Sequence, residues 1–302
     1  MTNKIDLHTH TTASDGTLEP EQLVALALER GLSAIAICDH DTTEGIERAL
    51  RAATCTGLTV IPGVEISTDI PRAEVHILGY MIDFTNQRFQ QMLSRLRDSR
   101  LDRAKRMVDK LAEMGMPISW ERVLEIAGSG AVGRPHIALA LVEKGYVDSP
   151  AEAFRKYIGR NGPAYVERYR LSPEQAVELV DSAGGISVLA HPLTTAGPTK
   201  EMGAELDLEK LLPRLEKAGL SGIEVFYPGY TSVMIDSLLK LAERNHLLTT
   251  GGSDFHGWGV LPTELGQVDV PRKALDSLYE AYKRRYGRPY QVPGYGGCEQ
   301  IQ

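Results

Sequence analysis

The chain of 302 residues has few cysteines and no long apolar run. Its three cysteines, Cys38, Cys55 and Cys298, are too few and too scattered for a disulfide framework or a Cys-x-x-Cys metal knuckle. We expect them to be reduced and structurally minor. No apolar run approaches the roughly 20 residues of a transmembrane helix, and the first residues lack the pattern of a secretory signal. These absences predict a cytoplasmic protein without membrane contact.

A general surplus of basic residues is also missing. The formal net charge is −7, which argues against a protein that holds long nucleic acids on a basic surface. Residues 95–170 are an exception, because they contain 15 Lys and Arg against 10 Asp and Glu. Such a basic segment suits an anionic ligand, although a solvated helix face gives the same pattern.

The order of short apolar runs predicts an α/β fold. Apolar strands alternate with helical segments over the first hundred residues and again after residue 170, which is typical of parallel β/α construction. We expect a first helix capped by Thr17 that ends at Gly31. The predicted strands cover residues 5–10, 32–38, 58–66, 75–82, 185–190, 222–226 and 246–251.

The middle of the chain has a different pattern. Apolar residues at helical spacing predict one long amphipathic helix from about residue 88 to 114, and no strand signal follows before residue 170. Shorter helices are expected at residues 120–127, 135–144 and 150–158. We therefore predict a first barrel part at 1–97, a helical insertion at 98–170, and a second barrel part at 171–302 that ends in an irregular tail from residue 287.

Histidines and carboxylates recur at or near the ends of the predicted strands. His8 and His10 are two residues apart, so the alternation of a strand directs both imidazoles to one face. Taken singly, such residues have structural explanations, since Asp15 can cap a turn and a strand-end histidine can be a core residue. The nine candidate metal ligands are His8, His10, Asp15, His40, Glu65, His76, His191, Asp254 and His256.

Together these nine residues indicate a metal site. In a parallel barrel the C-terminal strand ends converge on one mouth, which is where active sites are built. Imidazole and carboxylate without thiolate suit Mn²⁺, Zn²⁺ or Fe²⁺. Nine ligands exceed what one ion needs, so we expect two or three divalent ions.

The ordered motifs resemble the PHP (polymerase and histidinol phosphatase) family. They are His8-Thr9-His10, Asp39-His40-Asp41, the Glu65 turn, Ala190-His191-Pro192 and Ser253-Asp254-Phe255-His256. The resemblance implies a distorted seven-stranded (β/α)7 TIM-like barrel with a small helical insertion domain and three ions, with Mn²⁺ favoured. It assigns one ion to His8, His10, Glu65 and Asp254, a second to Glu65, His76 and His191, and a third to Asp15, His40 and His256.

The function implied is that of a metal-dependent phosphoesterase whose nucleophile is a hydroxide bridging the ions. The insertion resembles the subgroup of nucleotide 3′,5′-bisphosphate phosphatases and the 5′–3′ exoribonuclease ribonuclease AM. Our leading hypothesis is removal of the 3′-phosphate of a nucleotide 3′,5′-bisphosphate (pAp to AMP), with hydrolysis of short RNA as a further activity. Histidinol phosphate phosphatase, a cyclic sugar phosphate phosphodiesterase and a non-catalytic module remain alternatives.

Several residues are candidates for chemistry or substrate binding. Asp39, His191 and His256 are the candidate catalytic residues, although Asp39 and Asp41 can equally orient His40 or serve as turn residues. In Gly133-Arg134-Pro135-His136 a helix begins whose N–H groups and Arg134 guanidinium suit a phosphate, or which is a plain helix start. Lys156 and Arg160 are further candidates, and Tyr157 or Tyr165 can stack on a base or belong to the core. We expect a small anionic phosphate ester as ligand and no obligate protein partner.

Overall fold

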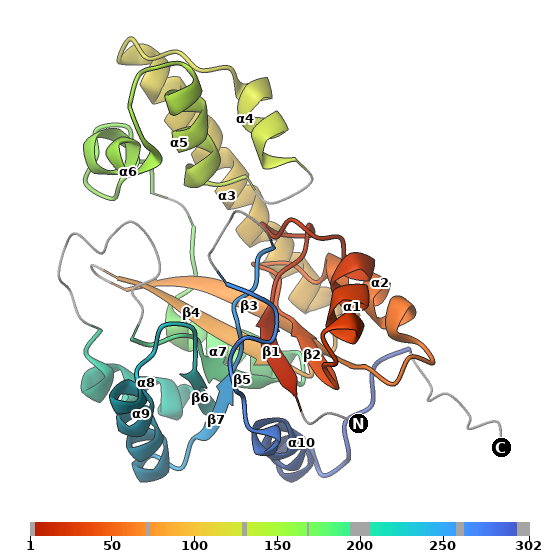
Figure 1. The fold of residues 1–302 in the computed structure, drawn as a ribbon. Coiled ribbons are helices and arrows are strands. Elements are labelled where there is room, and N and C mark those ends of the chain that lie inside the picture. Colours follow the sequence, from red (N-terminus) through yellow and green to blue (C-terminus); the bar gives the residue numbers. More distant parts are fainter. Residues whose placement is uncertain are drawn as a thin grey trace.

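The computed structural model describes residues 4–70, 73–128, 132–167, 169–193, 206–257 and 263–294. Within these ranges the chain forms an α/β fold around one curled, seven-stranded sheet in the order β1 to β7 (Figure 1). Every predicted strand is present, with ends shifted by a few residues. The strands are β1 (Ile5–Thr9), β2 (Ala34–Ile37), β3 (Thr59–Ile70), β4 (Ala73–Tyr80), β5 (Ile186–Leu189), β6 (Gly222–Phe226) and β7 (Leu248–Gly251).

Strand β4 departs from the expected parallel construction. It pairs antiparallel with both β3 and β5, whereas β1 to β3 and β5 to β7 are parallel. No helix separates β3 from β4, so the two strands form a hairpin rather than a crossover. Because β4 runs backwards, its first half lies beside the second half of β3, where His76 pairs with Ser67.

The edges of the sheet approach each other at the mouth. At the end of β1, Thr9 forms an isolated parallel bridge with Phe255, and the backbone N–H of His10 donates to the Phe255 carbonyl at 2.9 Å. In the described ranges β1 and β7 are otherwise not paired as strands. The sheet is thus a curled half-barrel, and a completely closed barrel stays a prediction.

Most of the helices pack against the sheet. They are α1 (Pro20–Glu29), α2 (Glu44–Ala53), α7 (Pro173–Ser182), α8 (Leu208–Ala218), α9 (Ser232–Arg244) and α10 (Arg272–Tyr286). Helix α1 is capped by Glu19, not by Thr17 as predicted. The Thr17 backbone N–H instead donates to the carbonyl of His256 at 2.7 Å, which ties the loop before α1 to the last strand-end motif.

Two faces of the sheet belong to two hydrophobic clusters. In β2, Ile35 and Ile37 pack in the cluster that contains the outer helices α1, α2, α7, α8 and α9. Ala34 and Ala36 belong to a second cluster, which contains one face of α10. Since side chains alternate along a strand, α10 and its cluster fill part of the sheet face opposite to the outer helices.

The middle of the chain forms a helical layer that projects from the sheet (Figure 1). It comprises α3 (Gln87–Glu113), α4 (Trp120–Ala127), α5 (Arg134–Glu143), α6 (Pro150–Ala153) and the π-helical turn η1 (Phe154–Ile158). The first half of α3 packs through Phe89 and Leu96 in the hydrophobic cluster that contains the outer helices. Met107 and Leu111, in the second half, belong to a separate cluster within the layer. The interpretation of this layer as an insertion domain with boundaries at residues 98 and 170 stays a prediction.

Three further predictions concern membrane helices, the cysteines and the C-terminal tail. Among the described residues, no helix is both long and apolar enough to cross a membrane. Cys38 is buried and Cys55 exposed, both as free thiols, while Cys298 lies outside the described residues. Residues 288–294 contain no helix or strand, and the rest of the predicted tail also lies outside the described ranges.

Candidate metal centre

The nine predicted ligands converge at one end of the sheet. His8 lies in β1, His40 follows β2 and bridges to Glu65 of β3, and His76 lies in β4. The remaining ligands follow β1, β5 and β7 in loops. Ligand atoms within 4.8 Å of one another form three overlapping groups: His10, Asp15, His40 and His256; His8, His10, Glu65 and Asp254; and His40, Glu65 and His76.

Glu65 is the centre of this arrangement. Its side chain is 1% exposed, and its two carboxylate oxygens are shared out among imidazoles from four strand ends. Oε2 lies 3.2–3.3 Å from the ring nitrogens of His8, His10 and His40. Oε1 lies 2.7 Å from His76 Nδ1 and 3.0 Å from His191 Nε2. One buried carboxylate therefore connects two sets of histidines, as expected of a ligand that bridges two ions.

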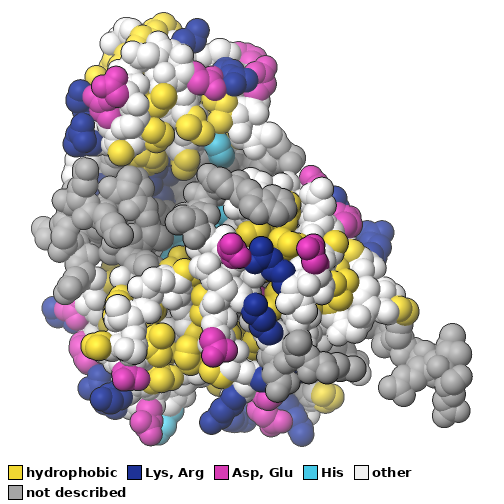
Figure 2. Space-filling view, in the orientation of Figure 1, with side chains coloured by type: hydrophobic (Ala, Val, Ile, Leu, Met, Phe, Trp, Pro, Cys, Tyr) yellow, Lys and Arg dark blue, Asp and Glu magenta, His cyan; other side chains and the backbone are white. Residues whose placement is uncertain are grey.

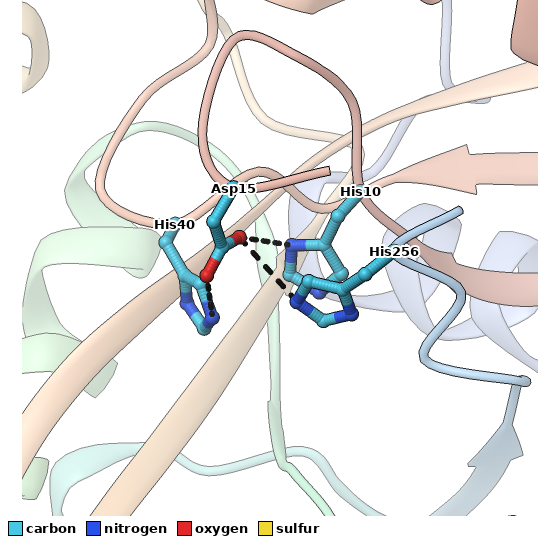
Figure 3. Close-up of side chains that lie close together, drawn as sticks. All are labelled: His10, Asp15, His40 and His256. Carbon is cyan, nitrogen blue, oxygen red and sulfur yellow. Dashed lines mark ion pairs between the residues drawn. The ribbon is translucent and has the colours of Figure 1, made fainter. Parts of the chain in front are cut away.

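The carboxylate of Asp15 faces three imidazoles, those of His10, His40 and His256 (Figure 3). Its Oδ1 lies 3.4 Å from His256 Nε2 and 3.9 Å from His10 Nδ1, and its Oδ2 lies 3.8 Å from His40 Nε2. These separations are longer than ordinary hydrogen bonds. They fit atoms that share one ion, because ligands at about 2.0–2.2 Å from a metal lie roughly 3–4 Å from one another.

Unpaired buried atoms test whether the residues fit metal ions. Neither ring nitrogen of His10 makes a hydrogen bond of acceptable geometry, and neither does Oδ1 of Asp254, although His10 Nε2 and this oxygen are 3.0 Å apart. Buried polar atoms are normally hydrogen-bonded. Nitrogens and oxygens that converge without such bonds are the arrangement expected around divalent cations, and the donor set of imidazole and carboxylate suits them.

The clustered charges shift the protonation of these residues strongly. Burial opposes protonation of His10, but the carboxylates of Asp254 and Glu65 outweigh it and raise its pKa to about 10. Burial would raise the pKa of Asp254, yet His8, His10 and His256 hold it well below its usual range. The carboxylates of Glu65 and Asp254 therefore favour protonation of His8 and His10, whereas burial lowers the pKa of His40 to about 4. Metal binding should release the protons on His8 and His10.

The geometric groups match two of the three ion sites implied by the family resemblance. Asp15, His40 and His256 stand together, and so do His8, His10, Glu65 and Asp254. For the remaining ion, the geometry groups His40 with Glu65 and His76, whereas the resemblance names His191. The short distance from His191 to Glu65 keeps it within reach, so its role as a ligand stays a prediction.

The carboxylates beside His40 are occupied by other partners. Asp39 accepts hydrogen bonds from the Thr11 backbone N–H, the Thr11 hydroxyl and the Ser14 hydroxyl, each at 2.7 Å. Asp41 accepts from Arg100 of α3 and from the Ser67 backbone N–H. Asp39 thus holds the loop that carries Asp15, and burial raises its pKa. A catalytic role for Asp39, His191 or His256 stays a prediction.

Sequence reasoning missed two residues that contact the predicted ligands. Glu224 of β6 contacts both His8 and His191, and the Tyr227 hydroxyl donates to Oδ2 of Asp254 at 2.7 Å. The available signal for Glu224 was a lone glutamate in the centre of an otherwise apolar strand, Gly222–Phe226. A charged residue there is buried, and buried carboxylates require partners.

The candidate substrate residues lie in the helical layer. At the start of α5 the Gly133 backbone N–H donates to His136 Nδ1 at 3.0 Å, and Arg134 lies over the rings of Phe154 and Tyr165. Burial lowers the pKa of His136, with Asp15 and Arg100 close enough to act on it as well. His136 at the start of α5 is thus within electrostatic range of Asp15 in the candidate metal centre. In Figure 2 histidine side chains are visible in the recess below the layer.

The other two candidates have protein partners. Arg160 donates to the carbonyl of Ile70 at 3.2 Å and so links the layer to the end of β3. Lys156 is half exposed and forms an ion pair with Glu152, one turn earlier in the same helical segment. A substrate role for either residue stays a prediction.

Comparison with known proteins gives consistent matches. The PHP domain family model matches residues 6–101. A 5′–3′ exoribonuclease of Haemophilus influenzae is 36% identical over 89% of this chain and 97% of its own length. A 3′,5′-nucleoside bisphosphate phosphatase of Chromobacterium violaceum is 33% identical over 94% of this chain and 98% of its own. A phosphoribosyl 1,2-cyclic phosphate 1,2-diphosphodiesterase of Eggerthella lenta is 33% identical over 83% and 94%.

A crystal structure agrees with these relatives. The protein, from Bifidobacterium adolescentis and described as a metal-dependent phosphoesterase, superimposes with a TM-score of 0.78 at 35% identity over 91% of this chain and 94% of its own. The named relatives all act on phosphate ester bonds. Because they match nearly the whole chain at more than 30% identity, the resemblance is confirmed: the chain belongs to the PHP domain family and is a metal-dependent phosphoesterase.

Proposed function

We propose that this phosphoesterase removes the 3′-phosphate of nucleoside 3′,5′-bisphosphates. The observation that carries the proposal is the position of His136 at the start of α5, where Asp15 of the candidate metal centre is near enough to affect its pKa, together with Arg134 in the same helical turn. A bisphosphate has two dianionic groups, and a helix start with an arginine suits the one that does not react. The phosphatase relative of Chromobacterium violaceum acts on the same class of substrate.

In this proposal the three ligand groups hold up to three divalent ions, with Mn²⁺ favoured and Zn²⁺ or Fe²⁺ as alternatives. Bound ions would act as Lewis acids toward the phosphoryl oxygens and make water a nucleophile near neutral pH. The residues of the chain orient the ester: Arg134 and His136 bind the remote phosphate, and the helical layer at 98–170 covers the mouth as a substrate-binding cap. The barrel parts at 1–97 and 171–302 supply the ligands.

A second activity, 5′–3′ hydrolysis of short RNA, is compatible with the same site. An RNA with a 5′-phosphate also offers one reacting ester and one remote anion, and the relative of Haemophilus influenzae is an exoribonuclease. Histidinol phosphate carries only the reacting phosphate, so that alternative needs no remote phosphate contact. The substrate named for the Eggerthella lenta relative, a phosphoribosyl 1,2-cyclic phosphate, carries a second phosphate on the ribose but reacts at a cyclic diester. The second anion therefore distinguishes the bisphosphate from histidinol phosphate, and the type of reacting ester distinguishes it from the cyclic phosphate.

The test is a panel of substrates with the Mn²⁺-loaded protein. We expect the highest kcat/KM for the 3′,5′-bisphosphate, lower values for 5′-phosphorylated short RNA, and much lower values for histidinol phosphate and a phosphoribosyl 1,2-cyclic phosphate. Glu65→Gln serves as the control for metal-independent contaminants. A higher kcat/KM for the cyclic ester or for histidinol phosphate than for the bisphosphate would refute the proposal.

A further inference from the structure

We propose that Glu224 is a positioning residue that fixes two ligands of the metal centre, His8 and His191, at once. The inference rests on the proposed metal binding. Glu224 lies in β6 and has no exposed surface. Its Oε1 lies 3.0 Å from His8 Nδ1, and its Oε2 accepts a hydrogen bond of 2.8 Å from the His191 backbone N–H. A single side chain thus joins β1 and the end of β5 through β6.

The first contact determines which nitrogen of His8 can bind a metal. An ionised carboxylate only accepts hydrogen bonds, so Nδ1 of His8 must carry the proton that lies between it and Glu224. The lone pair of a neutral ring is then on Nε2. This nitrogen lies 3.3 Å from both Glu65 Oε2 and Asp254 Oδ1, within the cluster. Such carboxylate–histidine pairs fix the tautomer and the ring orientation of metal ligands.

The second contact holds a backbone conformation that a histidine adopts rarely. His191 has a φ of +25°, and residues other than glycine occupy positive φ only where their surroundings impose it. The hydrogen bond from its N–H to Glu224 helps to impose this conformation. His191 Nε2 then lies 3.0 Å from Glu65 Oε1.

The variant Glu224→Gln tests both contacts because glutamine has the same shape but one acceptor oxygen. If that oxygen accepts from the His191 N–H, the amide NH₂ faces His8 Nδ1 and favours the tautomer with the proton on Nε2. If it accepts from His8 instead, the NH₂ opposes the His191 N–H, donor against donor. In either orientation one ligand loses its position.

The measurement is Mn²⁺ affinity of the metal-free proteins, by competition with a fluorescent chelator. We expect Glu224→Gln to bind Mn²⁺ about 10- to 100-fold more weakly than the wild type. Leu215→Ala, on the buried face of α8, is the control for a loss of stability at a residue outside the candidate metal centre. If the affinity loss of Glu224→Gln does not exceed that of Leu215→Ala at comparable thermal stability, Glu224 acts only in folding and the inference is wrong.

A second measurement is made on the wild type and does not depend on the folding of Glu224→Gln. In wild-type protein loaded with diamagnetic Zn²⁺ and labelled with ¹⁵N-histidine, NMR should show the His8 proton on Nδ1, with the assignment made from His8→Gln. A proton on Nε2 would overturn the inference. A wild type that binds neither Mn²⁺ nor Zn²⁺ would instead refute the metal centre itself, so the two failures are distinguishable.

Discussion

Replacement of Glu65 by glutamine should be the most damaging single change in the centre. Both carboxylate oxygens are used: Oε2 faces three histidines and Oε1 faces two more, all within 3.3 Å. An amide has only one oxygen and presents a donor in place of the other. Whichever way the amide is oriented, one set of histidines therefore loses its shared carboxylate.

The expected losses of metal and activity follow from the two sets of histidines that Glu65 connects. At least one equivalent of metal per chain should be lost. The retained ion should be bound more weakly because residue 65 no longer carries a negative charge. Removal of one electrostatic contact from a catalytic site typically lowers kcat by about 10² to 10³. We expect kcat/KM to fall by at least about 10², which corresponds to roughly 2.7 kcal/mol of transition-state stabilisation.

The assay combines elemental analysis of purified protein with kcat/KM on the bisphosphate and on p-nitrophenyl phosphate. Both substrates should lose activity together, because the chemistry rather than recognition is affected. Glu178→Gln, on the exposed side of α7, controls for the amide substitution itself. Unchanged metal content together with unchanged activity in Glu65→Gln would refute the reasoning that Glu65 bridges two ions.

Three further predictions can be checked with the same protein. Arg134→Ala should lower kcat/KM on the bisphosphate by one to two decades, or roughly 1.5–3 kcal/mol, and leave kcat/KM on p-nitrophenyl phosphate nearly unchanged. Equal losses on both substrates would contradict a remote phosphate contact. The wild type should contain two to three equivalents of Mn, Fe or Zn by elemental analysis and lose activity after chelation, with recovery on adding Mn²⁺; less than one equivalent from metal-replete medium would contradict the ligand assignment. Gly252→Ala should weaken Mn²⁺ binding, because the added Cβ would lie 2.4 Å from the backbone N and the Cβ of His8; unchanged affinity in a chelator competition would show that β1 can move aside.

The strands and the convergence of the candidate ligands at one end of the sheet were predictable from the sequence. Two histidines two residues apart at the end of the first predicted strand indicated a shared face, and the structure brings His8 and His10 together around Glu65. The helical layer was visible in the change from short apolar runs to helical spacing. These signals are local, since each depends only on the alternation of side chains along one element.

The contacts that hold the ligands in place were not predictable in the same way. The bond between Glu224 and His8 spans 216 residues of sequence separation, and the hydroxyl of Tyr227 reaches Asp254 from another loop. The predicted cap of α1 was wrong because the Thr17 backbone N–H donates a hydrogen bond to a distant loop. No local capping rule includes such a long-range bond. Such pairings depend on which strands become neighbours, and the local pattern does not specify this.

The reversed direction of β4 agrees with the position of its candidate ligand relative to the apolar residues of the same face. In β2 and β3 the ligand follows the apolar residues of its own face at steps of two: Ala36 leads to His40, and Ile61 leads to Glu65. In β4 the order is inverted, because His76 precedes Leu78 and Tyr80, which belong to the same apolar cluster as Ala36 and Ile61. If one end of a shared face is apolar and the other binds metal, a strand whose ligand comes first must run the opposite way. The antiparallel pairing of β3 with β4 places His76 opposite Ser67, and from there its Nδ1 lies 2.7 Å from Glu65 Oε1.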